Sequence, residues 1–301
     1  MKSAPIEPGE NNRLVLAAFL MFGAFLMFAS MDTMAKYMAA QGLPTLQIVF
    51  TRFLAHFVII VLFYLPHEGV QIFKSHTPKL QVLRGFGLLG STVFNFAALA
   101  YLPLTVTTAI FFATPLVVCL LSIKILNETV GARRLTAVFV GFLGVLVTTQ
   151  VWSADFHWAM LLSVAALLCV SFYFVLTRKI AGNSDSNAVS QIYASGLSLL
   201  FITPVAFYVW TTPSGPLQWV LLFMIGIFGA VGHTLLTIAH RFAQASTLAP
   251  LVYVQIIYAT VLSWLVFGAI PNFWTVAGTA IIVGSGFYIW QRERKLLAAD
   301  Q

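Results

Sequence analysis

Two apolar segments near the N-terminus contain ionisable side chains, which are costly in hydrocarbon and usually face a cavity or one another. Asp32 and Lys36 are four residues apart in the first segment, so they lie on one face of a helix. Arg52 and His56 have the same spacing in the second segment. At about 1.5 Å per residue from the ends where the segments meet, Asp32 and Arg52 both lie roughly 10 Å deep, within reach of each other. This cluster has two open interpretations: a structural ion pair between two helices, or a site that attracts an anionic or polar substrate group and titrates during a functional cycle.

Polar and aromatic side chains in the middle of later apolar segments are candidates for the rest of a pocket. Tyr253 and Gln255 are two residues apart and diverge by about 200° on a straight helix, so they do not line one narrow face together. Gln255 is the better candidate, because a buried amide without a partner is costly in lipid and a wet cavity removes that cost. The candidate substrate-binding or coupling residues are Asp32, Lys36, Arg52, His56, Asn95, Tyr173, His233, Tyr253, Gln255 and Tyr258.

Two histidines and two prolines are further candidates for functional residues. Histidine changes its charge near neutral pH, so His56 and His233 are candidates for proton coupling. A hydrogen bond between helices is the alternative role for each of them. Pro115 and Pro250 interrupt apolar segments, where each predicts either a gating bend or a tolerated kink.

The elements that position these residues are long and apolar. Of the 301 residues, 60% are hydrophobic and 8% are charged, whereas soluble domains are about 45–50% apolar and about 25% charged. About 20 apolar residues cross a bilayer as a helix, and segments of this kind follow one another through almost the whole chain. We predict an all-α membrane protein with ten transmembrane helices at residues 14–38, 45–65, 82–101, 104–125, 134–152, 157–178, 188–210, 217–239, 246–267 and 272–290.

Basic residues are concentrated in alternate connections, which predicts the orientation because Lys and Arg in short loops resist translocation. Both termini are then cytoplasmic, and Arg84 belongs to the cytoplasmic connection between the second and third helices. The formal charge of +7 follows from these loops and does not indicate nucleic-acid binding. The basic residues assigned to the cytoplasmic side are Lys2, Arg13, Lys74, Lys79, Arg84, Lys124, Arg133, Arg134, Arg178, Lys179, Arg241, Arg292, Arg294 and Lys295.

The order and lengths of the apolar segments agree between the two halves of the chain. Five helices per half is an odd number, so a repeat of this kind is inverted across the membrane. We predict a first five-helix repeat at 14–152 and a second at 153–292, between cytoplasmic tails at 1–13 and 293–301. The glycines that we expect to permit close helix packing are Gly141, Gly144, Gly226, Gly229 and Gly232.

Motifs for nucleotide-driven or hydrolytic chemistry are missing from the sequence. The run Gly85-Phe86-Gly87-Leu88-Leu89-Gly90 matches a dinucleotide pattern literally, but no strand precedes it, so we expect no cofactor. Neither a phosphate-binding loop with Gly-Lys-Ser/Thr nor a His-Glu-x-x-His or Gly-x-Ser-x-Gly motif occurs, which argues against an ATP-driven pump and a hydrolase. No metal-ligand spacing is present, so we expect no metal site and two free thiols at Cys119 and Cys169. An intramembrane enzyme, the alternative of another class, would need clustered carboxylates or histidines.

Three stretches recur together in one group of membrane proteins. They are Asp32-Thr33-Met34-Ala35-Lys36-Tyr37 leading to Phe50-Thr51-Arg52-Phe53, then Ala98 to Pro115 followed by Asn127-Glu128, and Ala249-Pro250-Leu251-Val252-Tyr253-Val254-Gln255 running on to Phe267-Gly268. Through them the chain resembles the drug/metabolite transporter superfamily, in particular its ten-span EamA group. One departure is Ala269, because the second half of such proteins usually has Glu after the Phe-Gly pair; the partner in the first half, Glu128, is present.

The resemblance implies a central cavity between the two halves and alternating access to the two sides of the inner (plasma) membrane. Transport is then secondary, driven by a gradient of solute or ions, and the partners are a small-molecule substrate, the lipid bilayer and, as a further hypothesis, a coupled proton. Some proteins that look like this one take up riboflavin, which is the substrate we expect. Amino-acid or metabolite export and S-adenosylmethionine uptake are the alternatives within the same superfamily. The sequence decides neither the direction of net transport nor the oligomeric state.

Overall fold

The computed structural model describes residues 8–126, 132–150, 152, 156–181, 185–242, 248, 251–252 and 254–299. Within these ranges every regular element is a helix. The helices are α1 (Pro8–Ala40), α2 (Thr45–Glu68), η1 (Gly69–Phe73), α3 (Pro78–Leu99), α4 (Leu104–Phe111), α5 (Thr114–Ile125), α6 (Ala132–Thr149), α7 (Ala159–Ala181), α8 (Asn187–Tyr208), α9 (Pro216–Phe242), α11 (Val254–Phe267) and α12 (Phe273–Ala299).

The helical segments follow the hydropathy of the sequence closely. In the described part of the chain seven helical stretches are long and apolar enough to cross a bilayer, and shorter apolar helices lie within α6, α11 and α12. Large apolar side chains are exposed on the outside of the bundle, for example Phe19, Leu62 and Trp264, as expected of a surface that faces lipid. Helix α12 continues to Ala299, beyond the start of the predicted C-terminal tail at 293.

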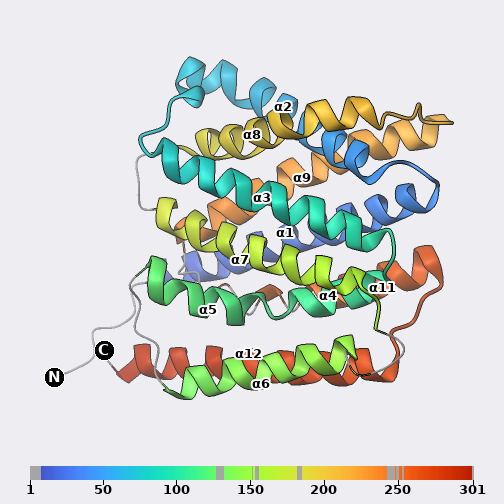
Figure 1. The fold of residues 1–301 in the computed structure, drawn as a ribbon. Coiled ribbons are helices and arrows are strands. Elements are labelled where there is room, and N and C mark those ends of the chain that lie inside the picture. Colours follow the sequence, from blue (N-terminus) through green and yellow to red (C-terminus); the bar gives the residue numbers. More distant parts are fainter. Residues whose placement is uncertain are drawn as a thin grey trace.

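The helices form one bundle that is several layers deep (Figure 1). Helix α2 lies beside α8 at one side of the bundle, and α6 pairs with α12 at the opposite side. Between these pairs, α1 packs along α9 and α3 packs along α7. The start of α1 and the end of α12 lie at the same end of the bundle, on the left of Figure 1.

Glycines permit the closest helix crossings, as the sequence predicted. A Cβ atom on Gly226 of α9 would lie 3.1 Å from the carbonyl oxygen of Arg52 on α2. A Cβ atom on Gly144 of α6 would lie 2.9 Å from the carbonyl oxygen of Gly278 on α12. Larger side chains at these positions would therefore force the helix backbones apart.

The fourth predicted span consists of two helices. Helix α4 ends at Phe111 and α5 begins at Thr114, with Pro115 in the first turn of α5. Proline has no N–H group to continue the hydrogen-bond ladder, which explains a break at this point. The corresponding Pro250 lies outside the described residues.

The placement of Arg84 in a cytoplasmic connection is wrong. Helix α3 begins at Pro78, a residue favoured in the first turn of a helix, so Arg84 lies inside the helix. Its side chain is 1% exposed. The guanidinium group is buried because polar groups of three other helices surround it, and the distribution of charge along the sequence does not reveal them.

Candidate functional site

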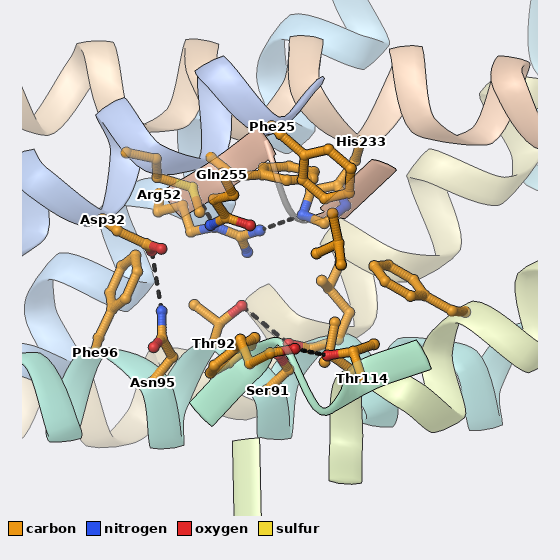
Figure 2. Close-up of a pocket in the computed structure, with 17 residues that line it drawn as sticks. Phe25, Asp32, Arg52, Ser91, Thr92, Asn95, Phe96, Thr114, His233 and Gln255 are labelled. Atoms are coloured by element: carbon orange, nitrogen blue, oxygen red, sulfur yellow. Dashed lines mark hydrogen bonds between the residues drawn. The ribbon is translucent and has the colours of Figure 1, made fainter. Parts of the chain in front are cut away.

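A cavity of about 70 Å³ lies between helices of the bundle (Figure 2). Side chains of helices from both halves of the chain surround it, including α1, α2 and α3 from the first half and α7, α9 and α11 from the second. Its polar lining is Asp32, Arg52, Ser91, Thr92, Asn95, Thr114, His233 and Gln255. Its aromatic lining is Phe25, Phe28, Phe96, Phe111 and Phe174.

Arg52 on α2 is the central charged group of this cavity. Its side chain is 0% exposed, and its Nη2 lies 2.8 Å from Nε2 of His233 on α9. Its Nε contacts the sulfur of Met31 at 3.4 Å, and the ring of Phe53 lies 4.1 Å from its Cζ. Its Nη1 has no hydrogen-bond partner among the described residues. The guanidinium group is therefore held in place but not fully satisfied.

The contact with Arg52 determines which nitrogen of His233 carries a proton. A guanidinium group only donates hydrogen bonds, so Nε2 of His233 accepts and bears no hydrogen. A neutral ring then carries its hydrogen on Nδ1, which lies 3.2 Å from the hydroxyl oxygen of Tyr173 on α7. The ring of His56 stacks on that of His233 with centroids 5.9 Å apart. Neither ring nitrogen of His56 completes a hydrogen bond of ordinary geometry with the described residues.

The ion pair between Asp32 and Arg52, one of the two interpretations of this cluster, does not form. No nitrogen–oxygen contact within 4.0 Å joins these two described residues. Asp32 instead accepts a hydrogen bond of 3.0 Å from the side-chain amide of Asn95 on α3. Arg52 instead reaches His233 on α9. Both charged groups still line the same cavity (Figure 2).

The other candidates predicted from the sequence occupy different positions. Lys36 donates to the carbonyl oxygens of Leu99 and Leu102 at 3.1 and 2.7 Å, so it ties α1 to the end of α3. Tyr173 is fully buried beside His233, and Tyr258 is half-buried against the apolar core. Tyr253 lies outside the described residues. The cavity thus brings together Asp32, Arg52, Asn95, His233 and Gln255.

A second buried arginine, Arg84, lies beyond Tyr173. Its Nη2 donates to the hydroxyl of Tyr173 at 2.9 Å and to that of Thr237 at 3.4 Å. Its Nε donates to the hydroxyl of Thr177 at 2.8 Å, and its Nη1 donates to the carbonyl oxygen of Ser190 at 2.8 Å. One guanidinium group therefore joins α3 to α7, α8 and α9.

A buried carboxylate, Asp185, lies at the same end of the bundle as the start of α1. It accepts hydrogen bonds from the hydroxyl of Ser75 at 2.6 Å, the backbone N–H of His76 at 2.7 Å and the amide of Gln81 at 3.0 Å. Its Oδ1 also lies 3.1 Å from Nδ1 of His76. Burial alone would raise the pKa of Asp185, but the hydrogen bonds from Gln81, Ser75 and His76 outweigh it and hold the pKa well below 3.8. The loop before α3 is thereby fastened to the loop before α8, and we call this contact the Asp185 latch.

A neutral contact fastens the opposite end of the bundle. The side-chain amide of Gln47 donates to the carbonyl oxygen of Thr211 at 2.7 Å, and its oxygen accepts from the Thr211 N–H at 2.9 Å. This contact joins the start of α2 to the connection between α8 and α9. In the structure both ends of the bundle are therefore held together by hydrogen bonds.

We did not predict roles for Arg84, Asp185 or the hydroxyl groups of Ser91 and Thr92, although one signal was present in the sequence. Arg84, Ser91 and Asn95 are spaced by seven and four residues, which places them on one face of a helix. A polar stripe on an otherwise apolar helix indicates a buried polar pathway rather than a lipid-facing surface. No comparable local signal exists for Asp185, because its donors come from another part of the chain.

Comparison with known proteins assigns the chain to a family. Residues 15–150 and residues 157–291 each match the EamA-like transporter family. The chain belongs to this family. The expectation of a multi-pass membrane transporter rather than an enzyme is thereby confirmed.

Two kinds of curated relative match most of the chain. It is 30% identical over 285 residues to a riboflavin transporter of Vibrio cholerae, covering 92% of this chain and 94% of that protein. It is 27% identical over 269 residues to an S-adenosylmethionine uptake transporter of Rickettsia felis, covering 89% and 90% respectively. The relatives agree on transport of a small molecule and differ in the molecule that is named.

A solved crystal structure has the same overall fold. It superposes with a TM-score of 0.69 at 18% sequence identity and covers 93% of this chain and 98% of that chain. At this identity the match supports the arrangement of the helices alone.

Proposed function

We propose that the protein is a secondary transporter of the inner membrane that moves a small organic metabolite by alternating access. In this proposal ten spans form two inverted five-helix repeats, at 14–152 and 153–292, with cytoplasmic tails at 1–13 and 293–301. The pairing of helices supports the symmetry: α1 packs on α9 in the same way that their repeat equivalents α7 and α3 pack together. The two separate family matches fall on the same halves.

The observation that carries this function is the central cavity. It is lined by helices of both halves, so a relative motion of the halves would open it to one side or the other. Five phenylalanines supply flat apolar walls, and buried polar side chains supply orientation. Such a lining fits a metabolite with a flat heterocycle and a few polar groups.

Two candidate substrates share that description. Riboflavin is the candidate that the sequence analysis favoured, and the Vibrio cholerae relative has that name. S-adenosylmethionine is the second candidate, because the Rickettsia felis relative has that name and the cavity lining contains both a carboxyl and a guanidinium group, Asp32 and Arg52. Both compounds contain a fused planar ring that the phenylalanine walls would contact.

Uptake by intact cells tests the proposed function. Cells that cannot synthesise riboflavin would express either the chain or an Arg52→Ala variant at equal membrane levels, and accumulation of labelled riboflavin would be measured. Saturable uptake that falls at least tenfold in the variant is the expected result. The same cells would be tested with labelled S-adenosylmethionine, and absence of both activities above the vector control would exclude both candidate substrates.

In this proposal His233 is the residue that binds the coupled proton. Protonation places a hydrogen on Nε2, which then no longer accepts from Arg52, so the 2.8 Å hydrogen bond and the added proton exclude each other. We expect His233→Gln in proteoliposomes to abolish accumulation driven by an imposed pH gradient while exchange of labelled for unlabelled substrate persists. His240→Gln is the matched control, because His240 is buried on the same helix and contacts the carbonyl oxygen of Leu236. Gradient-driven accumulation by the His233 variant would assign the coupling elsewhere.

A further inference from the structure

An open groove of about 500 Å³ runs along the outside of the bundle between α6 and α12, the pair at the bottom of Figure 1. None of the residues that line it also lines the central cavity. The lining residues recur at helical spacing and are Thr136 and Val140 on α6 and Ala280, Ile281, Gly284, Ser285 and Tyr288 on α12.

Gly284 opens the groove on the side of α12. A Cβ atom added there would lie within 4 Å of no other described part of the chain, its own helix turn aside. At Gly278, on the same helix, a Cβ atom would instead lie 2.6 Å from the carbonyl oxygen of Gly144 on α6. The hydroxyl of Ser285 is already used, because it donates to the carbonyl oxygen of Ile282 at 2.8 Å. The groove therefore offers mainly apolar contacts, which suit a hydrocarbon chain.

The length of the groove matches one leaflet of a bilayer. From Ala280 to Tyr288 the helix advances by eight residues, or about 12 Å. The hydrocarbon core of a bilayer is about 30 Å thick, so one leaflet contributes about 15 Å. A single acyl chain of the nearer leaflet would therefore lie along most of the groove.

The ends of α6 and α12 that border the groove lie at the same level. A Cβ atom on Gly141 of α6 would lie 2.8 Å from the hydroxyl oxygen of Ser285 on α12. A Cβ atom on Gly144 would lie 3.0 Å from the backbone nitrogen of Ile282. The two helices are thus antiparallel with a fixed register, in which the start of α6 is level with the part of α12 that follows Tyr288.

This end of the groove is basic. Arg292 follows Tyr288 by four residues and Arg133 precedes Thr136 by three, so each continues a helix face that lines the groove. It is also the predicted cytoplasmic end of both helices. The same two helix ends contain the further basic residues Arg134, Arg294 and Lys295 and the acidic residue Glu293.

We propose that the groove binds an anionic phospholipid of the cytoplasmic leaflet. One acyl chain would lie between α6 and α12, and the phosphate group would lie at the basic end, where basic residues attract anionic head groups. The charge of this end argues against a second copy of the chain as the occupant. A symmetric pair uses the same patch on both copies, so it would bring the two basic ends together, and like charges repel.

Native mass spectrometry of the purified protein, released from detergent micelles, tests this proposal. The protein would be incubated with equal amounts of phosphatidylglycerol and phosphatidylcholine that have identical acyl chains, and each bound lipid would be identified by its mass. We expect at least fivefold more bound phosphatidylglycerol than phosphatidylcholine on the wild type, because only the former is anionic.

A bulky substitution connects the bound lipid to the groove. Gly284→Phe places a ring in the space along α12 and should reduce binding of phosphatidylglycerol at least fivefold. Leu200→Phe is the matched control, because Leu200 is 69% exposed on α8, at the opposite side of the bundle, and does not line the groove. This control should stay within twofold of the wild type.

A charge substitution connects the preference for anionic lipid to the basic end. Arg292→Gln should lower the ratio of bound phosphatidylglycerol to phosphatidylcholine at least threefold while binding of phosphatidylcholine changes less than twofold. Arg294→Gln, the matched control, removes the same charge two residues further along α12, about 200° around the helix axis. It should change the ratio less than twofold. Thermal unfolding would verify that each variant is folded, and the two arginine variants decide the matter if Gly284→Phe is not.

Three results would overturn the proposal, and none of them depends on transport of a substrate. Equal binding of the two lipids to the wild type would remove the preference for an anionic head group. Unchanged phosphatidylglycerol binding by folded Gly284→Phe would place the lipid elsewhere. A mass of two chains that Gly284→Phe converts to the mass of one would assign the groove to a second copy.

Discussion

Replacing Arg84 with alanine is expected to cause the largest loss of stability among single substitutions in this protein. The guanidinium group donates to Tyr173, Thr177, Ser190 and Thr237. Hydrogen bonds to charged groups contribute about 1.5–3 kcal/mol each, and the acceptors left in the apolar interior would lack partners, so a loss on the order of 5 kcal/mol is expected. Thermal unfolding of the purified protein in detergent would measure it.

Two further variants determine the cause of that loss. Arg84→Lys keeps the positive charge but has a single ammonium group that does not reach all four acceptors, so an intermediate loss is expected. Lys79→Ala removes a basic residue from an exposed position on the same helix and should leave the melting temperature within a few degrees of the wild type. A melting temperature of Arg84→Ala equal to that of the Lys79 control would show that the four hydrogen bonds contribute little.

The helices were predictable because the physical signal is local. Runs of apolar residues must form helices in hydrocarbon, where each backbone group needs a partner within its own segment. The position of Pro115 likewise indicated the break between α4 and α5, since proline disturbs the ladder wherever it occurs. Close packing at Gly144 and Gly226 was also visible as small residues at helical spacing.

The contacts of the charged residues were less predictable because they depend on distant helices. Spacing placed Asp32 and Arg52 at similar depths, and both line one cavity, but it did not reveal that His233 on α9 contacts Arg52 and that Asn95 on α3 donates to Asp32. Arg84 was assigned to a loop because basic residues near the end of an apolar segment usually lie outside the membrane. Its acceptors on α7, α8 and α9 are too far away in the sequence to be inferred from local patterns.

Opening of the bundle at the predicted cytoplasmic end is expected to depend on the Asp185 latch. The carboxylate accepts from several donors before α3 and at its start, so Asp185→Asn, which keeps only one acceptor oxygen, should weaken the latch. A cysteine introduced at Ala181, which lines a small pocket beside Asp185, would report opening in a background where Cys119 and Cys169 are serine. We expect an impermeant maleimide, added from the cytoplasmic side, to label this cysteine at least fivefold faster in the Asp185 variant.

The titration of Asp185 gives the same latch a pH dependence with a definite sign. Its pKa in the folded protein lies below the ordinary value of 3.8. The ionised carboxylate therefore stabilises the fold fully above pH 3.8, and this contribution is lost as the pH falls from 3.8 through the pKa of the folded protein. Asp185→Asn should therefore reduce the loss of stability that acid causes. Glu68→Gln is the control for the labelling experiment, because it removes a carboxylate that accepts from the Ser186 hydroxyl. Equal labelling rates in the Asp185 variant and the Glu68 control would mean that the buried carboxylate does not hold this end closed.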